Sequence, residues 1–113
     1  GHPVGDAVLS SIAANLLSLI REDDILARVG GEEFAILLPN TLIDSAINLA
    51  ERIRYFQEAS KVTGNSGHVI NNTISIGVAI SHSDDTDFKQ VFLRADNALY
   101  QAKKQGRNRV IAE

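Results

Sequence analysis

A short polar turn between two apolar runs restricts the fold of this chain more than any other feature. Residues 25–29 read Ile-Leu-Ala-Arg-Val, residues 34–38 read Phe-Ala-Ile-Leu-Leu, and only the tetrapeptide Gly-Gly-Glu-Glu at residues 30–33 separates them. Two glycines between apolar runs predict a tight β-hairpin, because primed turns need positive φ angles that glycine adopts without steric cost. Two adjacent carboxylates then lie at the edge of the hairpin.

Spacing alone leaves two interpretations of this turn open. Gly30 and Gly31 have no side chains, so the phosphates or the base of a ligand can lie close to the backbone. Glu32 and Glu33 can hold a divalent cation beside that ligand, because hard cations prefer carboxylate oxygens. Alternatively, the two glutamates only keep a solvated turn soluble. Spacing by itself favours this second interpretation, because Gly-Gly turns followed by acids are common.

Three segments have apolar residues at helical spacing. They predict helices over residues 6–21, 41–60 and 87–105. Asp6 suits the start of the first helix, where a carboxylate meets free N–H groups and the positive end of the dipole. Thr41 begins the sequence Thr-Leu-Ile-Asp, a near capping box for the second helix. The segment Asp-Asp-Thr-Asp at residues 84–87 predicts a turn and the N-cap of the third helix.

The remaining segments predict strands and a loop. Residues 73–80 alternate apolar and small side chains, which indicates a strand whose small face lets a helix or a ligand approach closely. Residues 61–72 are rich in Gly, Asn and Ser and predict a loop with a brief extended piece at residues 68–70. Gly106 is suited to follow the third helix, and residues 107–112 predict a last strand. This order favours an α+β fold with helices packed on a mainly antiparallel sheet.

Composition limits the class of protein. The chain has 113 residues, 44% of them hydrophobic, which fits one folded domain. Its net charge of −3 and pI of about 5.5 argue against a nucleic-acid-binding surface, although a small basic cluster is enough to hold a nucleotide. It has no cysteine, which fits a reducing cytoplasm. No apolar run approaches the roughly 20 residues of a membrane span, so any membrane part of a parent protein would lie outside this chain.

The sequence Arg-x-Gly-Gly-Glu-Glu-Phe at residues 28–34 resembles the signature of the GGDEF family, the bacterial diguanylate cyclases, in its Gly-Gly-Glu-Glu-Phe variant. Other matches lie at compatible distances, and the resemblance covers essentially every residue. It implies the adenylate-cyclase-like, ferredoxin-like GGDEF fold. With this resemblance, the ligand- and metal-binding interpretation of the turn is preferred over the interpretation that the two glutamates only keep it soluble.

The same resemblance implies that residues 1–113 form only part of a GGDEF domain, roughly its C-terminal two thirds. Residues 1–6 read Gly-His-Pro-Val-Gly-Asp, which resembles a Gly-His-x-x-Gly-Asp segment well inside the family domain. The family's first strand, which carries a metal-binding Asp, and its first helix are then missing. We expect unpaired sheet edges and an uncovered apolar face. Such a piece would be unstable alone, pair with another copy, or be left after proteolysis.

Diguanylate cyclases join two GTP molecules into cyclic di-GMP and release two pyrophosphates. Each domain binds one GTP, two domains meet face to face, and the implied cofactor is Mg²⁺ or Mn²⁺. By resemblance, Glu32 matches a metal-binding carboxylate, and Glu33 matches the acidic position near the metals and the reacting hydroxyl. Gly30 and Gly31 match the turn that packs against the nucleotide. Asp6 matches the residue that accepts hydrogen bonds from the guanine edge, although an ordinary helix-capping acid is an equal alternative on spacing alone.

Two sets of basic residues complete the resemblance. Lys103 and Arg107 match the phosphate-binding pair of the family's Lys-x-x-Gly-Arg-Asn pattern, which reads Lys-Lys-Gln-Gly-Arg-Asn at residues 103–108. Alternatively, they are cations that complement the dipole at a helix C-terminus. Arg21 and Asp24 form an Arg-x-x-Asp motif, with five residues between Asp24 and the first glycine of the turn. That is the spacing of the family's inhibitory cyclic di-GMP site, and Arg52 matches an additional arginine there. The alternative is a surface ion pair of little energetic value.

The resemblance therefore implies a GTP-using, Mg²⁺-dependent diguanylate cyclase with product inhibition, in a parent protein with a sensor or receiver domain. This chain alone is expected to be inactive, because one metal carboxylate is missing. A different class remains open, a non-catalytic cyclic di-GMP receptor, and so does a purely structural dimerisation domain. The three histidines show no metal-ligand spacing and receive no role.

Overall fold

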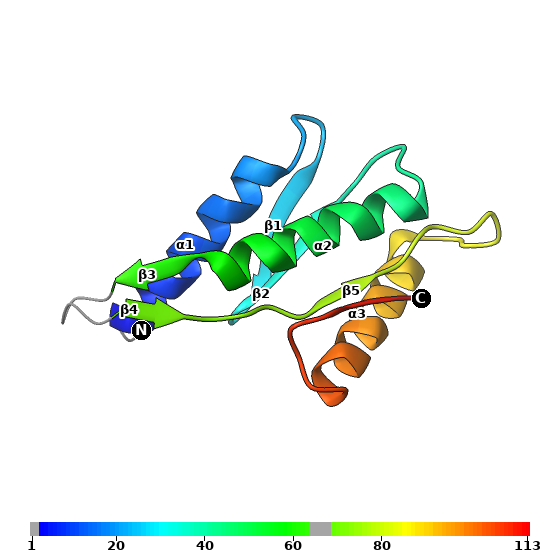
Figure 1. Cartoon of the computed structure of the whole chain (residues 1–113). Helices are drawn as coiled ribbons and strands as arrows, with labels where there is room; N and C mark the ends of the chain where they lie inside the picture. Colours follow the sequence, from blue (N-terminus) through cyan, green and yellow to red (C-terminus); the bar gives the residue numbers. More distant parts are fainter. Residues whose placement is uncertain (1–2, 64–68) are drawn as a thin grey trace.

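The computed structural model describes residues 3–63 and 69–113, and it describes side chains for residues 7–60 and 72–113. The described residues form three helices and three pairs of short strands, joined by turns and loops (Figure 1). The predicted helices and the hairpin are all present. In chain order the elements are α1 (Pro3–Leu19), β1 (Ile25–Gly30), β2 (Glu33–Leu37), α2 (Ile43–Ala59), β3 (Lys61–Thr63), β4 (Val69–Asn71), β5 (Ile76–Val78), α3 (Phe88–Lys104) and β6 (Val110–Ala112).

The strands form three separate pairs within the described residues. β1 pairs with β2 and β3 pairs with β4, both antiparallel, whereas β5 and β6 are parallel, with Ile76 opposite Val110. No ladder joins one pair to another in this part of the chain, so each strand has an edge without a hydrogen-bonded neighbour. The predicted antiparallel pairing holds for two of the three pairs.

The segment at residues 61–72 differs from its prediction. The sequence predicts a loop with an extended piece at residues 68–70, but the structure has a small hairpin in which Lys61 pairs with Asn71. Residue 68 itself lies outside the described residues. Strands of three residues are too short to produce a clear alternation of apolar and polar residues, so the turn-forming composition dominated the prediction.

The core lies where α1 and α2 pack over one face of the β1–β2 hairpin. In Figure 1 α2 crosses in front of these strands, and α1 lies beside β1. Ile12 and Leu16 of α1 and Ile53 of α2 are buried at its centre. Around them pack the partly buried residues Val8, Leu19, Leu26, Phe34, Ile36, Leu49, Ile74 and Ile76. This cluster fixes α2 relative to the hairpin.

α3 packs directly on β5 because Gly77 has no side chain. A Cβ atom at Gly77 would lie 2.1 Å from the carbonyl oxygen of Ala95 and 2.3 Å from the backbone nitrogen of Leu99. Real Cβ atoms do not approach backbone so closely, so only glycine permits this distance between helix and strand. The strand face that the sequence predicted to carry small side chains is therefore the face of β5 on which α3 packs.

Several predicted ends of elements need correction. The near capping box at Thr41 is not formed: Leu42 occupies the N-cap of α2 without a side-chain bond, and the Thr41 hydroxyl donates to the carbonyl of Pro39 at 2.9 Å. The cap of α3 is confirmed, since Asp87 accepts from the backbone nitrogen of Gln90 at 3.3 Å. The last strand begins at Val110, because the residues just before it form a left-handed turn.

The outer face of the β1–β2 hairpin is apolar and uncovered. Ile25, Val29 and Leu37 are 55%, 51% and 42% exposed, whereas Leu26 and Phe34 turn to the core. The expected uncovered apolar surface is therefore present on this element. No helix in the described part of the chain combines the length and the apolar character needed to span a bilayer.

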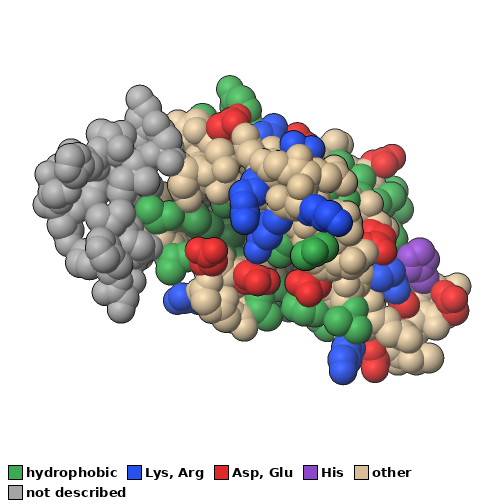
Figure 2. All heavy atoms as spheres, turned by 90° about the horizontal axis from the view of Figure 1, so that it is seen from below, with side chains coloured by type: hydrophobic (Ala, Val, Ile, Leu, Met, Phe, Trp, Pro, Cys, Tyr) green, Lys and Arg blue, Asp and Glu red, His purple; other side chains and the backbone are tan. Residues whose placement is uncertain are grey.

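Charged side chains of both signs lie near one another on the face seen in Figure 2, with Lys and Arg side chains next to Asp and Glu side chains. The shortest ion pair among the described side chains joins α3 to the loop before it: Arg94 donates to both carboxylate oxygens of Asp85, at 2.8 and 2.6 Å. This bond, with a backbone hydrogen bond from His82, holds the pKa of Asp85 well below its usual range.

The contact at Gly77 gives a first prediction. Gly77→Ala should lower the free energy of unfolding by about 3 kcal/mol or more, since the new methyl group overlaps backbone that cannot rotate away. Gly31→Ala is the comparison, because it meets open space and costs only the left-handed backbone penalty of about 1–2 kcal/mol. Urea denaturation measures both, and equal losses would contradict the close packing of α3 on β5.

Candidate functional site

The hairpin between β1 and β2 turns at Gly31 and Glu32, one residue later than the Gly-Gly pair. Gly30 is the last residue of β1 and lies opposite Glu33, with a bulge between Arg28 and Gly30. Gly30 and Gly31 have φ angles of 151° and 51°, as the prediction of positive φ requires. Glu32 therefore lies in the turn, whereas Glu33 begins β2.

Arg28 stabilises this turn, which the sequence did not indicate. Its guanidinium donates to the carbonyl oxygen of Gly31, from Nε at 2.8 Å and also from Nη2. The guanidinium thus bonds a carbonyl three residues further along the chain and provides this acceptor with charged donors. Glu32 and Glu33 are both exposed, so their carboxylates are free to meet a ligand.

A hollow of about 220 Å³ brings residues of the hairpin and α3 together. It is lined by Glu33 of β2 and by Asp96, Leu99, Tyr100 and Lys103 of α3. The structure therefore joins two of the predicted site residues, Glu33 and Lys103, which are 70 positions apart in the chain. Asp96 and Tyr100 were missed by sequence reasoning, because their helical spacing also fits an ordinary exposed helix face.

Arg107 lies in the turn just after α3. Gly106 and Arg107 end the helix with two backbone bonds, from Gly106 N to the carbonyl of Lys103 at 3.4 Å and from Arg107 N to the carbonyl of Ala102 at 2.9 Å. This is the pattern of a Schellman motif, as the glycine predicted. Arg107 is exposed and is not among the residues that line the hollow of Glu33 and Lys103.

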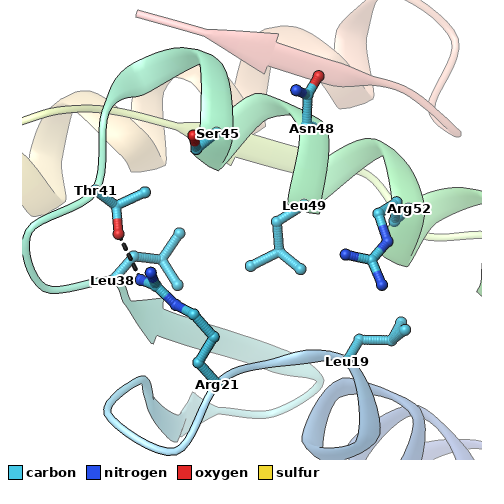
Figure 3. A pocket seen from close by; sticks show the side chains of 8 residues that line it. All are labelled: Leu19, Arg21, Leu38, Thr41, Ser45, Asn48, Leu49 and Arg52. Atoms are coloured by element: carbon cyan, nitrogen blue, oxygen red, sulfur yellow. Dashed lines mark hydrogen bonds between the residues drawn. The ribbon is translucent and has the colours of Figure 1, made fainter.

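A second hollow, of about 250 Å³, lies between α2 and the loop after α1 (Figure 3). Arg21 and Arg52, both predicted for one inhibitory site, line it together. In Figure 3 Leu49 and Arg52 extend from α2 toward the hollow, and Arg21 reaches across from the other side. The other lining residues are Leu19, Leu38, Thr41, Ser45 and Asn48.

Asp24 acts on this hollow through Arg21. Its side chain is fully buried, and its carboxylate accepts from Arg21 at three atoms: the backbone nitrogen at 2.8 Å, Nη2 at 3.1 Å and Nε at 3.3 Å. These bonds hold the pKa of Asp24 below its ordinary value, despite burial. Arg21 also donates to the Thr41 hydroxyl at 2.6 Å, so the guanidinium is held from both sides.

Asp6 lies in the first turn of α1, but its side chain is outside the described part of the structure. Among the described side chains, no group of three or more His, Cys, Asp or Glu residues is arranged to hold a metal ion. Mg²⁺ is commonly bound through one or two carboxylates together with substrate phosphates and waters. Glu32 and Glu33 could supply the one or two carboxylates that such a Mg²⁺ site takes from the protein.

Comparison with known proteins identifies the family. The family model described as diguanylate cyclase, GGDEF domain, matches residues 1–109. The chain belongs to the GGDEF family. Among its relatives, diguanylate cyclase DgcM of Escherichia coli (strain K12) is 45% identical over 112 residues, which are 99% of this chain and 26% of DgcM. The chain thus spans about a quarter of that relative.

Solved GGDEF structures share the fold. The active GGEEF domain of a diguanylate cyclase from Vibrio cholerae superposes with a TM-score of 0.87 at 38% identity, over 99% of this chain and 70% of that one. The GGDEF domain of DgcB from Caulobacter crescentus, in complex with c-di-GMP, superposes with a TM-score of 0.93 at 32% identity, over 99% and 66%. The predicted GGDEF family and its α+β fold are thereby confirmed.

The buried Asp24 carboxylate predicts acid sensitivity. Because its pKa is lower in the folded state than in the unfolded chain, it stabilises the fold above a pH of about 4 and loses this effect as the pH falls through the folded pKa. Asp24→Asn should therefore show a smaller loss of stability than the wild type when urea denaturation is repeated between pH 7 and pH 3. The pKa of Asp85 is also lowered in the folded state, so Asp85 adds to the loss of stability in acid. In Asp24→Asn this loss should therefore become smaller but should not disappear.

The exposed neighbour Asp23 provides the control, since it forms no salt bridge among the described residues. Asp23→Asn should leave the dependence of stability on pH close to that of the wild type. An identical acid loss in Asp24→Asn and Asp23→Asn would contradict the role given to Asp24.

Proposed function

We propose that this chain belongs to a diguanylate cyclase that condenses two GTP molecules into cyclic di-GMP and releases pyrophosphate. The observation that carries the proposal is the hollow shared by Glu33 and Lys103 in a chain of the GGDEF family. An acidic hairpin and a basic helix end meet there, and both charges are needed to bind a metal–nucleotide complex.

The residues have separate tasks in binding GTP. Lys103 and Arg107 bind the β- and γ-phosphates, Lys103 as a point charge and Arg107 as a two-pronged donor. A Cβ atom added at Gly30 or Gly31 would meet no atom within 4 Å, so the space beside these two residues is open to the nucleotide. Asp6 accepts hydrogen bonds from the N1–H and N2–H groups of guanine.

In the reaction, the 3′-hydroxyl oxygen of each nucleotide forms a bond to the α-phosphorus of the other. At each phosphorus the bond to the pyrophosphate oxygen breaks, so two pyrophosphates leave and the product is cyclic. Glu33 accepts the proton of the attacking hydroxyl. Glu32 and Glu33 would hold Mg²⁺, or Mn²⁺, which neutralises the negative charge of the phosphates. Each domain binds one GTP, so two copies meet face to face in a homodimer.

Product inhibition operates through the hollow of Arg21 and Arg52. Two guanidinium groups on opposite sides of one hollow suit a ligand with phosphates and a guanine edge that offers the O6 and N7 acceptors. DgcB from Caulobacter crescentus was solved in complex with c-di-GMP, which supports a cyclic di-GMP site in this family. The same hollow supports the second candidate function, a non-catalytic cyclic di-GMP receptor controlled by a sensor or receiver domain.

Substitution of Glu33 tests the catalytic proposal. In the full-length protein that carries this chain, Glu33→Gln should lower the rate of pyrophosphate release from Mg–GTP by about 100-fold or more, because the general base is lost. Removal of Mg²⁺ with a chelator should abolish turnover of the wild type. Asp44→Asn, an equal change of charge at an exposed position on α2, is the control. An unchanged rate in Glu33→Gln would refute the assigned role.

Calorimetry with cyclic di-GMP tests the second hollow. Arg21→Ala should weaken binding of cyclic di-GMP by about 10- to 100-fold, as expected for loss of a bidentate arginine contact to guanine. In the same variant, added product should no longer slow turnover. Lys89→Ala, which removes one positive charge from α3, is the control. Binding of cyclic di-GMP without any turnover of GTP would favour the receptor, and binding of neither nucleotide would favour a structural dimerisation domain.

A further inference from the structure

The turn after α3 places the proposed phosphate-binding Arg107 in an uncommon backbone conformation. Gly106, Arg107 and Asn108 have φ angles of 122°, 65° and 47°. Glycine adopts such angles freely and asparagine does so more readily than most residues, but an arginine there is uncommon. Residues in such conformations persist where the surrounding structure holds them, and they cluster at ligand sites.

The helix end alone does not hold the whole turn. The two Schellman bonds fix the backbone nitrogens of Gly106 and Arg107, but they do not reach Asn108. Arg109 Nε adds a bond to the carbonyl oxygen of Arg107 at 3.1 Å. The conformation of Asn108 therefore depends on contacts from outside α3.

Those contacts come mainly from α2. The side-chain oxygen of Asn108 accepts from Arg54 Nη1 at 3.0 Å, and its side-chain nitrogen donates to Glu58 Oε2 at 2.5 Å. Its backbone nitrogen donates to the hydroxyl of Ser75 at 3.2 Å. Both ends of the amide and the backbone N–H are thus bound, by residues 33 to 54 positions away in the chain.

Arg54 is itself held in place. Its side chain is only 19% exposed, and it contacts the carboxylates of Glu51 at 3.4 Å and Glu58 at 3.7 Å. Hydrogen bonds with a charged partner are stronger than neutral ones, and here they act at a partly buried position. The cluster of Arg54, Glu51, Glu58 and Asn108 therefore joins α2 firmly to the turn.

The side chain of Arg107 differs from its neighbours. It is exposed, and among the described residues it makes no hydrogen bond or salt bridge. The backbone on both sides is fixed, while the guanidinium stays available for a ligand. Such an arrangement restricts the position of the Arg107 guanidinium, while its N–H donors remain available to a ligand.

We propose that Arg54 and Asn108 are positioning residues that hold Arg107 where its guanidinium and Lys103 bind the phosphates of GTP together. The inference rests on the proposed function, because it presumes that these two cations meet a nucleoside triphosphate. Neither Arg54 nor Asn108 touches the substrate. Their effect on binding passes through the backbone of Arg107.

A double-mutant cycle tests this dependence. The full-length protein is titrated with Mg²⁺ and the α,β-methylene analogue of GTP, which cannot release pyrophosphate, for wild type, Asn108→Ala, Arg107→Met and the double variant. Asn108→Ala should weaken binding about tenfold, within the range of coupling between contacting residues. In the Arg107→Met background, the same substitution should cause no further loss.

Two comparisons separate positioning from a general loss of structure. Asn108→Gly keeps the left-handed backbone but removes the amide, so it should weaken binding of the analogue by a similar factor while the protein stays folded. Asn97→Ala removes an asparagine side chain from α3 itself, which donates to Glu113 at 2.8 Å, and should bind like the wild type. Arg54→Met should match Asn108→Ala.

The outcomes distinguish the two proposals. If the wild type binds no analogue, the proposed function fails, and this inference fails with it. If the wild type binds but Asn108→Gly binds equally well, only the positioning role is refuted. It is also refuted if Asn108→Ala weakens binding as much in the Arg107→Met background as in the wild type, because Asn108 then does not act through Arg107.

Discussion

The direct packing of α3 on β5 is the constraint on which the rest of the structure depends. At Gly77 the helix backbone lies where the Cβ atom of any other residue would be, so the distance between helix and strand is fixed by backbone contact. Because α3 lies in direct backbone contact with β5 at Gly77, the turn that follows its C-terminus lies next to the same strand pair. Lys103 and the turn with Arg107 therefore come to lie at one end of a rigid helix–strand unit.

α2 supports both candidate sites at once. Ile53 is buried in the core, and its neighbours Arg52 and Arg54 project to different surroundings. Arg52 lines the hollow with Arg21, whereas Arg54 binds Asn108 in the turn after α3. A helix residue and the second residue after it point about 200° apart, so one helix can contact two regions. The two regions thereby share one rigid support.

Local sequence patterns predicted most of this fold. The three helices and the hairpin were found because apolar spacing and glycine turns are set by nearby residues. The close approach at Gly77 followed from the small face of one strand. The parallel pairing of β5 with β6 and the hairpin of β3 with β4 were not predicted, because short strands leave a weak pattern and pairing is decided by distant residues.

In the candidate sites, too, the sequence predicted the local motifs but not the contacts between distant residues. The motifs named Glu33, Lys103, Arg21 and Arg52, and the structure places each pair at one hollow. The contacts that hold these residues were not visible in the sequence. Thr41 resembles a helix cap but accepts from Arg21 instead, since that guanidinium lies within 2.6 Å and the N-cap position falls to the next residue.

The dimensions of the hollows bear on how a nucleotide would be bound. Pockets that enclose small ligands measure roughly 300–1,000 Å³, whereas the hollow of Glu33 and Lys103 measures about 220 Å³. A GTP molecule held there, as proposed, would extend beyond it, and its binding would depend on charge at fixed points rather than on enclosure. Point contacts lose affinity quickly when a cation is displaced, because nothing else confines the phosphates. An open site of this kind places more weight on the residues that fix its cations than an enclosed site would.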